Sequence, residues 1–142
     1  MRGVHAAMMS HPTSFNNATP QMLAIKLLNI TYHGKAAHAA AFPWKGVNAL
    51  DAVIHAYSGI SNLRQQIPPT ARIHGIITNG GAKANIIPEV ASMQYILRED
   101  TKASLQTLCA RAECVFRAAA QATGCSVDLD WEGKPFDHMI NN

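Results

Sequence analysis

The sequence predicts an α+β fold, a ferredoxin-like two-layer sandwich with the order β-α-β-β-α-β, in which two helices cover one face of a four-stranded antiparallel sheet. Three observations lead to this prediction. Four stretches show alternating apolar residues, and two stretches with helical spacing lie between them. Every element has a single apolar face, so two layers bury all of them. A chain of 142 residues is long enough to bury one such core.

The first half of the chain supplies one strand and one helix. Leu28, Ile30 and Tyr32 alternate with polar residues and predict a strand that ends at Gly34. The small residues of 35–41 follow as a connection. A helix of about five turns is expected next, and it ends by Ile67 because two prolines forbid its continuation. Its predicted apolar face consists of Val47, Leu50, Ile54, Tyr57 and Ile60.

Two further strands follow this helix. The first is expected over residues 71–78, and Asn79-Gly80-Gly81 after it predicts a turn, because asparagine and glycine tolerate positive φ. Residues 82–89 are expected to form a loop and residues 90–98 a strand. The core-facing side of that strand is predicted to carry Ala91, Met93, Tyr95 and Leu97.

A second helix and a last strand complete the pattern. Asp100 or Thr101 can cap the helix by accepting from its free backbone N–H groups, and Gly124 suits a left-handed helix end. Strict alternation over residues 125–132 predicts the final strand. The buried stripe of the helix is expected to be Leu105, Leu108, Ala112, Phe116 and Ala119. The open face of the sheet is expected to be polar, with Asn29, Thr31, His33, Arg72, His74, Ser92, Gln94 and Arg98.

Composition excludes several functional classes. A net charge of +3 is too small and too scattered to indicate nucleic acid or an anionic membrane as partner. An RNA-recognition domain shares the element order but needs aromatic residues on the open sheet face, whereas Tyr32 and Tyr95 fall on the inner face. Three cysteines without close pairing predict free thiols, and no long apolar run is present, so we expect a cytoplasmic protein.

The residues alone do not make a complete active site. No zinc-binding spacing, nucleophile elbow or phosphate loop occurs in the sequence. His11 and His38 differ from the other five histidines because they lie in irregular segments rich in small residues and proline. Loops on a rigid scaffold are where functional groups tend to lie, which makes these two histidines the candidates.

Two strings resemble a known family. The first string is Gly34-Lys35-Ala36-Ala37-His38-Ala39-Ala40, followed by Pro43-Trp44 and by residues 46–51. The second string begins with residues 72–77 and continues with Asn79-Gly80-Gly81 and Ala84-Asn85-Ile86-Ile87-Pro88-Glu89. These strings are similar to the dimerisation, or lid, domain of metallopeptidase family M20, which includes aminoacylases and carboxypeptidases. They are closest to the branch of amidohydrolase-type dipeptidases that cleave dipeptides with a basic C-terminal residue. The resemblance covers residues 5–142.

The resemblance implies roles for individual residues. His38 matches the lid histidine that reaches the active site of the partner protomer and stabilises the oxyanion formed when water attacks an amide carbonyl. Asn85 matches a residue that holds the substrate, and His11 matches a ligand of the catalytic metal, expected to be zinc. His74 matches a histidine to which we assign no role.

The resemblance also implies how the chain is divided. Residues 1–24 correspond to a remnant of the metal-binding catalytic domain, residues 25–132 to the lid, and residues 133–142 to the return into the catalytic domain. The other metal ligands and the general base are missing from the sequence, so the chain alone is expected to hold no stable zinc and to be inactive. The expected partners are a second copy or a full-length homologue, and a dipeptide-like substrate. The alternative is a non-catalytic dimerisation or interaction module.

Overall fold

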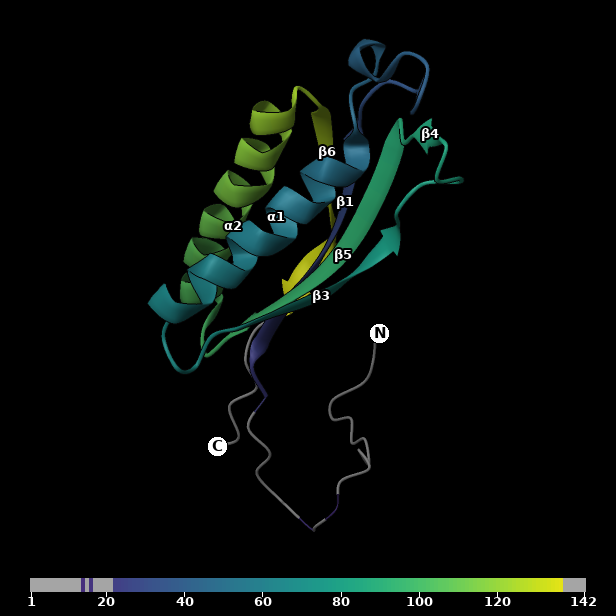
Figure 1. The fold of residues 1–142 in the computed structure, drawn as a ribbon. Coiled ribbons are helices and arrows are strands. Elements are labelled where there is room, and N and C mark those ends of the chain that lie inside the picture. Colours follow the sequence, from purple (N-terminus) through teal and green to yellow (C-terminus); the bar gives the residue numbers. More distant parts are fainter. Residues whose placement is uncertain (1–13, 15, 17–21, 137–142) are drawn as a thin grey trace.

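The predicted sandwich is present in the computed structural model, which describes residues 14, 16 and 22–136. Four strands, β1 (Ala24–His33), β3 (Arg72–Asn79), β5 (Val90–Glu99) and β6 (Ser126–Phe136), form one antiparallel sheet in the order β3-β5-β1-β6. Helices α1 (Ala49–Leu63) and α2 (Lys102–Thr123) lie on the same face of this sheet (Figure 1). The expected β-α-β-β-α-β order and its two layers are therefore confirmed.

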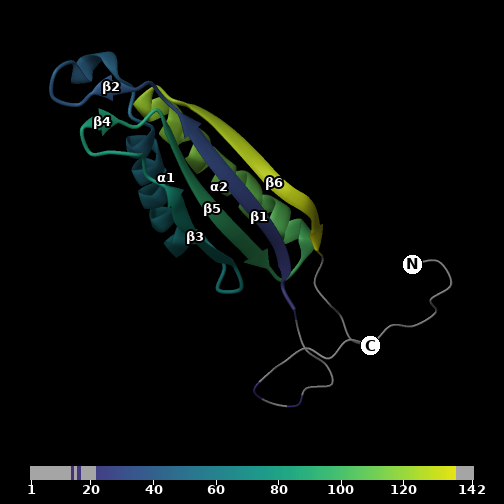
Figure 2. The ribbon, with the colours of Figure 1, turned by 90° about the vertical axis from the view of Figure 1, so that its right-hand side faces the viewer.

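The sheet is built around β1. Leu28 of this strand pairs with Tyr95 of β5 on one side and with Trp131 of β6 on the other. As a result β3 and β6 are the edges of the sheet, and Figure 2 shows the four strands side by side in this order. An edge strand presents unpaired backbone N–H and C=O groups, so each edge is a surface on which another strand can pair.

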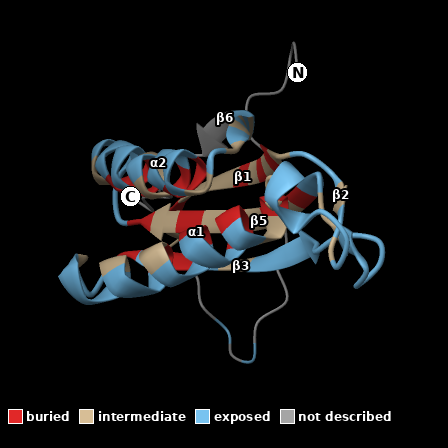
Figure 3. Ribbon diagram, turned by 45° about the horizontal axis from the view of Figure 1, so that its top comes forward, coloured by how far each residue is buried: buried red, intermediate tan, exposed pale blue. Residues whose placement is uncertain are grey.

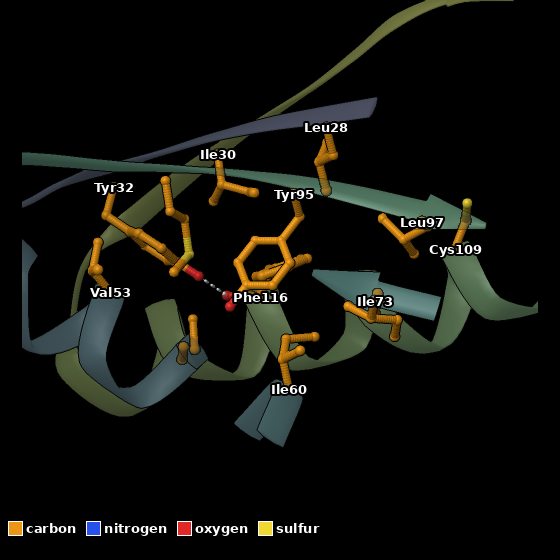
Figure 4. Packing of buried hydrophobic residues seen from close by; sticks show 14 of the residues in the cluster. Leu28, Ile30, Tyr32, Val53, Ile60, Ile73, Tyr95, Leu97, Cys109 and Phe116 are labelled. Carbon is orange, nitrogen blue, oxygen red and sulfur yellow. Dashed lines mark hydrogen bonds between the residues drawn. The ribbon is translucent and has the colours of Figure 1, made fainter. Parts of the chain in front are cut away.

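The core lies between the sheet and the two helices, and Figure 3 shows buried residues alternating with more exposed ones along the strands and helices. Two tyrosines from neighbouring strands meet Phe116 of α2 there (Figure 4). The hydroxyl of Tyr32 donates to the carbonyl of Phe116 at 3.0 Å, and the rings of Tyr95 and Phe116 pack with centroids 5.5 Å apart. Burial raises the pKa of the Tyr32 hydroxyl and raises that of Tyr95 to about 12.

The predicted apolar face of α1 is wrong, except for Ile60. Ile54 and Tyr57 are exposed, Leu50 is half-buried, and Val47 precedes the helix. The buried residues are Ala49, Ala52, Val53, Ala56 and Ile60. This set has the same helical spacing but is made mostly of alanine, because α1 packs closely against its neighbours. At Gly59 an added Cβ would lie only 2.5 Å from Val115 of α2.

The helix ends follow local side-chain chemistry. Asn48 caps α1 through its side-chain oxygen, which accepts the N–H of Leu50 at 2.9 Å. Thr101, one of the two expected caps of α2, forms a reciprocal capping box with Ser104. Gly124 ends α2 with φ of 75°, as its sequence position predicts. A short 3-10 turn, Arg64–Gln66, follows α1 before the two prolines.

The open face of the sheet carries the expected polar side chains in a connected array. The amide of Gln94 donates to Asn29, and the amide of Asn29 donates to Glu132, both at 2.8 Å. His33 lies 2.9 Å from the carboxylate of Asp128. The face is less polar than predicted, since Leu27 and Ile96 pair across it as half-buried neighbours. These polar contacts run from Asn29 in the middle of β1 to His33 at its end.

Two short strands lie where loops were predicted. Ala37–His38 forms β2 and Ile86–Ile87 forms β4, and they pair antiparallel as a separate two-stranded ladder. Strands of two residues carry no readable alternation, which is why the sequence pattern does not reveal them. Cys109, Cys114 and Cys125 are free, as expected. Neither helix in the described part of the chain has the length and apolar character that crossing a membrane requires.

Candidate functional site

The candidate site lies on a small substructure at the end of the sheet where β1 finishes. Residues 34–48 and 80–89 form it, and we call it the crown; both segments lie at the same end of the sheet in Figures 1 and 2. Backbone bonds join the two segments: Gly34 N–H donates to the carbonyl of Glu89 at 2.7 Å, and Ala49 N–H, where α1 begins, donates to that of Pro88 at 2.9 Å. Because few crown side chains are buried, these backbone bonds carry much of its order.

Two glycines allow the crown to close. Lys35 and Val47 exchange backbone hydrogen bonds of 2.8 and 2.9 Å, and a Cβ on Gly34 would lie 2.1 Å from the carbonyl oxygen of Val47. A Cβ on Gly46 would lie 2.9 Å from the side chain of Ile87. Only hydrogen fits at Gly34, which faces backbone, whereas a Cβ at Gly46 would require the Ile87 side chain to shift.

His38 is exposed on β2, and its ring is held by its own turn. The N–H groups of Ala40 and Ala41 both donate to Nδ1, at 3.2 and 3.1 Å. The N–H of Phe42 donates to the backbone carbonyl of His38 at 3.2 Å. A nitrogen that accepts hydrogen bonds carries no proton, so the neutral ring bears its proton on Nε2. His38 thus offers an oriented N–H donor at the surface.

Asn85 lies beside His38 although the two residues are far apart in sequence. The N–H of Ala39 donates to the carbonyl of Asn85 at 3.0 Å, and Ile86 pairs directly with His38 in the ladder. Both His38 and Asn85 are exposed. The β2–β4 ladder therefore brings together two of the three residues that the sequence singles out. A neutral imidazole N–H and a carboxamide are both suited to an oxyanion or a carboxylate.

The third residue, His11, lies outside the described residues. Within residues 14, 16 and 22–136, no group of three or more His, Cys, Asp or Glu side chains is arranged to hold a metal ion. His74 lies exposed on the open face of β3, away from the ladder. The described residues by themselves therefore do not provide a metal site.

Sequence reasoning missed the aromatic tip of the crown. Phe42 and Trp44 are 51% and 74% exposed, and their rings pack edge to face with centroids 5.9 Å apart. Pro43 begins the 3-10 turn that holds them. Two aromatic residues around a proline, next to a histidine in a small-residue stretch, were the signal that could have found this feature.

Two open cavities adjoin the ladder, and both are lined in part by Ile86. One, of about 390 Å³, lies between Ala39, Lys83 and Asn48 near the start of α1. The other, of about 350 Å³, is bordered by Ala36 and Glu89. His38 and Asn85 line neither cavity, although their chain neighbours Ala39, Ala84 and Ile86 border the first one.

A second surface of interest lies along β3. Ile76 and Ile77 of this edge strand are 62% and 40% exposed. One stripe of α1 consists of Leu50, Ile54 and Tyr57. It lies about half a turn around the helix from Gly59, which packs on α2. At one end of the stripe, Leu50 approaches Gly80, next to β3. The stripe thus faces the β3 side of the molecule. We call this combined area the β3-side apolar surface; it consists of Ile54, Tyr57 and Ile77, because Ile77 pairs with the helix-facing Met93, whereas Ile76 pairs with Gln94 on the open face of the sheet.

Comparison with known proteins identifies relatives of the chain. It is 49% identical to a mouse protein and 43% identical to a human protein, both named Xaa-Arg dipeptidase, over 134 residues that make up 94% of this chain. It is 33% identical to one of the subunits of the p-aminobenzoyl-glutamate hydrolase of Escherichia coli over 97% of its length. The chain spans 31%, 31% and 29% of these relatives.

Solved structures share the fold. An aminobenzoyl-glutamate utilization protein from Klebsiella pneumoniae superposes with a TM-score of 0.72 at 25% identity, over 84% of this chain and 30% of that protein. An amidase of the hydantoinase/carbamoylase family from Burkholderia vietnamiensis gives 0.75 at 16% identity, over 84% of this chain and 29% of that protein, which is a likeness of fold alone. Residues 24–123 match the model of the peptidase dimerisation domain of family M20. This chain therefore belongs to the M20 peptidase dimerisation domain family.

Proposed function

We propose that this dimerisation domain is the lid of a metal-dependent dipeptidase, an amidohydrolase that cleaves the amide bond of dipeptides with a C-terminal arginine or another basic residue. The Xaa-Arg dipeptidases of mouse and human support the substrate class. The observation that carries the proposal is the fixed orientation of His38, whose Nδ1 accepts two backbone N–H groups. This geometry leaves Nε2–H free to donate to a substrate oxygen outside the crown.

In the proposed reaction His38 stabilises developing negative charge. When water adds to the amide carbonyl, the carbonyl oxygen becomes an oxyanion, and the Nε2–H of His38 donates a hydrogen bond to it. The donor needs no reorientation at that moment, because the turn at Ala40 and Ala41 already holds the ring. The carboxamide of Asn85, on the adjoining segment, would donate to the substrate carboxylate and fix its position.

We further propose that a second copy of the chain covers the β3-side apolar surface. Ile77 lies on an edge strand whose outer backbone groups are free to pair with another strand. Two copies related by a twofold axis would join their β3 strands antiparallel and bring Ile54 and Tyr57 of each α1 into the same contact. Such a dimer allows His38 to act on the partner's site.

The remaining parts of the proposal concern segments beyond this domain. Residues 1–23 and 137–142 would belong to the metal-binding domain, with His11 as one ligand of a divalent ion that we expect to be zinc. Ala24 and residues 133–136, which the sequence assigned to the flanks, lie instead in β1 and β6 of the sheet. Three free thiols support the cytoplasm as the compartment.

A chimera tests the role of His38. In it, this chain replaces the matching segment of the mouse Xaa-Arg dipeptidase. We expect His38→Ala to reduce turnover of an Xaa-Arg dipeptide on the order of a hundred- to a thousand-fold, the loss that removal of one oxyanion donor causes. His55→Ala, which changes an exposed histidine of α1, is the matched control. An inactive chimera, or a His38→Ala variant with nearly full turnover, would contradict the proposal.

A mixed dimer tests whether His38 acts across the interface. In this dimer of the chimera, one protomer carries His38→Ala and the other carries His11→Ala. The two protomers have different affinity tags, so that only the mixed dimer is purified. Action in trans leaves one intact site and about half of the original turnover, because a twofold dimer has two equivalent sites. Action within one protomer leaves no intact site, so absence of turnover would refute the trans arrangement.

The dimer surface is tested on the isolated chain by sedimentation. We expect the chain to sediment as a dimer and Ile77→Lys to sediment as a monomer, because an ammonium group on the helix side of β3 would be buried in the joint apolar contact. Ile86→Lys places the same change on an exposed isoleucine of the crown and should leave the dimer intact. A wild-type monomer at high concentration would exclude this surface. A stable dimer whose chimera lacks hydrolysis would favour the non-catalytic module.

A further inference from the structure

The aromatic tip of the crown is joined directly to the histidine turn. The N–H groups of Ala40 and Ala41 hold the His38 ring, and the next residue along the chain, Phe42, donates its N–H to the His38 carbonyl. Trp44 follows within the 3-10 turn Pro43–Lys45. A proline at the start of this turn restricts its backbone. His38 and Trp44 are thus presented by one continuous, internally bonded loop.

The aromatic pair already binds a cation. The ammonium of Lys45 lies 4.8 Å from the centroid of the Phe42 ring, which is the geometry of a cation–π contact. Trp44 packs against Phe42 edge to face, with an interplanar angle of 86°, and remains 74% exposed. Tryptophan is the side chain that attracts cations most strongly through its ring. Its indole is therefore an open receptor for a second cation.

The charges of the crown explain why an aromatic ring suits this task. Its charged side chains are three lysines, Lys35, Lys45 and Lys83, and one acid, Glu89. A basic crown attracts the C-terminal carboxylate that every dipeptide carries. An additional acidic side chain in the crown would attract the cation of the substrate, but it would also repel the terminal carboxylate of the substrate. The face of an indole attracts a cation through its quadrupole without adding negative charge.

We propose that Trp44 is a specificity-determining residue, whose indole face stacks on the cationic side chain of the substrate's C-terminal arginine. The proposal rests on the proposed function, since it names the residue that reads the basic side chain at the same site. The terminal carboxylate of the substrate lies toward Asn85 and the lysines, while the guanidinium lies over the ring. Arginine also suits this contact geometrically, because its planar group stacks on aromatic faces.

The test compares two substrates of nearly the same shape, one with a cationic and one with a neutral side chain. The chimera with the mouse relative is assayed with an Xaa-Arg dipeptide and with the matching Xaa-citrulline dipeptide, in which a neutral urea replaces the guanidinium. Trp44→Leu keeps an apolar side chain and removes the ring, and Trp44→Phe keeps a ring. We expect Trp44→Leu to reduce the ratio of kcat/KM values for arginine over citrulline by roughly two- to thirty-fold, and Trp44→Phe to retain most of it.

Each outcome decides the proposal. An unchanged arginine-to-citrulline ratio in Trp44→Leu overturns it, and an equal loss of activity on both substrates would instead identify Trp44 as a contact to the catalytic domain. A wild-type chimera that does not distinguish the two substrates overturns it as well. The side chain is exposed, so melting temperatures of the variants should match the parent. His38→Ala separates the two proposals, because it should slow both substrates equally and preserve their ratio.

Discussion

The crown and the sandwich beneath it are stabilised in different ways. In the sandwich, side chains such as Leu28, Tyr95 and Phe116 are fully buried, and burial of apolar surface is the main stabilising term. In the crown, most side chains are exposed, and order comes from backbone hydrogen bonds and from close approaches at Gly34 and Gly46. The candidate residues His38 and Asn85 lie on the region that adds no side chain to the buried core.

This difference separates the requirements of folding from those of function. A change in the core acts on the whole cooperative unit, because α1, α2 and the sheet share one hydrophobic cluster. A change in the crown can displace His38 and Asn85 while the sandwich stays folded, because the crown adds little to that cluster. Mutations in the two regions should therefore differ in kind as well as in size.

The largest effect is expected in the core. Phe116→Ala removes a fully buried ring that packs on Tyr95, and the lost transfer energy and the cavity should cost about 3–5 kcal/mol of unfolding free energy. Urea denaturation of the chain measures it. Gln121→Ala, at an exposed position of the same helix, is the control and should change little. A loss below about 1 kcal/mol would mean that α2 is not essential to the cooperative unit.

The second effect is expected to stay within the crown. Gly34→Ala places a Cβ 2.1 Å from the carbonyl oxygen of Val47, so the backbone bridge between Lys35 and Val47 must open, at a cost of about 1–3 kcal/mol. Hydrogen exchange should accelerate at the amides of Lys35 and Val47 and remain slow at Leu28. Gly80→Ala is the matched control in the crown, since its Cβ would make an ordinary 3.6 Å contact with Leu50.

If exchange accelerates equally in β1 after Gly34→Ala, the two regions form one cooperative unit and the contrast between them is wrong. Exchange confined to the crown would confirm the contrast. The same variant in the chimera should lose turnover, because His38 lies on the segment that Gly34 begins.

Most of the sandwich could be predicted from the sequence because its elements are long enough to show a period. Alternation identified β1 and β5, and local chemistry identified the Thr101 cap and the Gly124 end of α2. The buried face of α1 could not be read in the same way. Large residues such as Ile54 carry more hydrophobicity than alanine, whereas close packing selected the alanines.

The site was less accessible to sequence reasoning. The pairing of His38 with Ile86 joins segments with no periodicity, and only the resemblance to a family placed Asn85 among the candidates. The two N–H groups that orient the His38 ring come from alanines, which carry no polar signal in the sequence. Their role depends on the turn geometry, and this is a property of the folded backbone alone.

A smaller effect distinguishes the two buried tyrosines of the sandwich. Tyr32→Phe loses the hydrogen bond to the carbonyl of Phe116 and should cost about 1 kcal/mol. The hydroxyl of Tyr95 is buried without a partner among the described residues, so Tyr95→Phe should be neutral or stabilising. Urea denaturation of both variants measures this difference. Equal losses would show that Tyr95 also has a hydrogen-bond partner in solution.

The smallest expected effect is a difference in the labelling rates of the three free thiols, which report on opening of the crown and of the sandwich. Cys114 is exposed and should react first with a maleimide near neutral pH. Cys125 is half-buried, and its thiol donates to the carbonyl of Asn48 in the crown at 3.6 Å, so it should react when the crown opens. Cys109 should react last, because burial raises its pKa to about 11 and thiolate is scarce below that pH.

The order of labelling tests the contrast between the regions without disturbing the fold. Mass spectrometry of the intact chain and of its peptides would follow each thiol in time. Gly34→Ala should accelerate Cys125 and leave Cys109 slow, whereas Phe116→Ala should accelerate Cys109, because opening of the core both exposes its thiol and removes the burial that raises its pKa. If Gly34→Ala accelerates both thiols alike, the crown does not open independently, and the site that it carries is as rigid as the core.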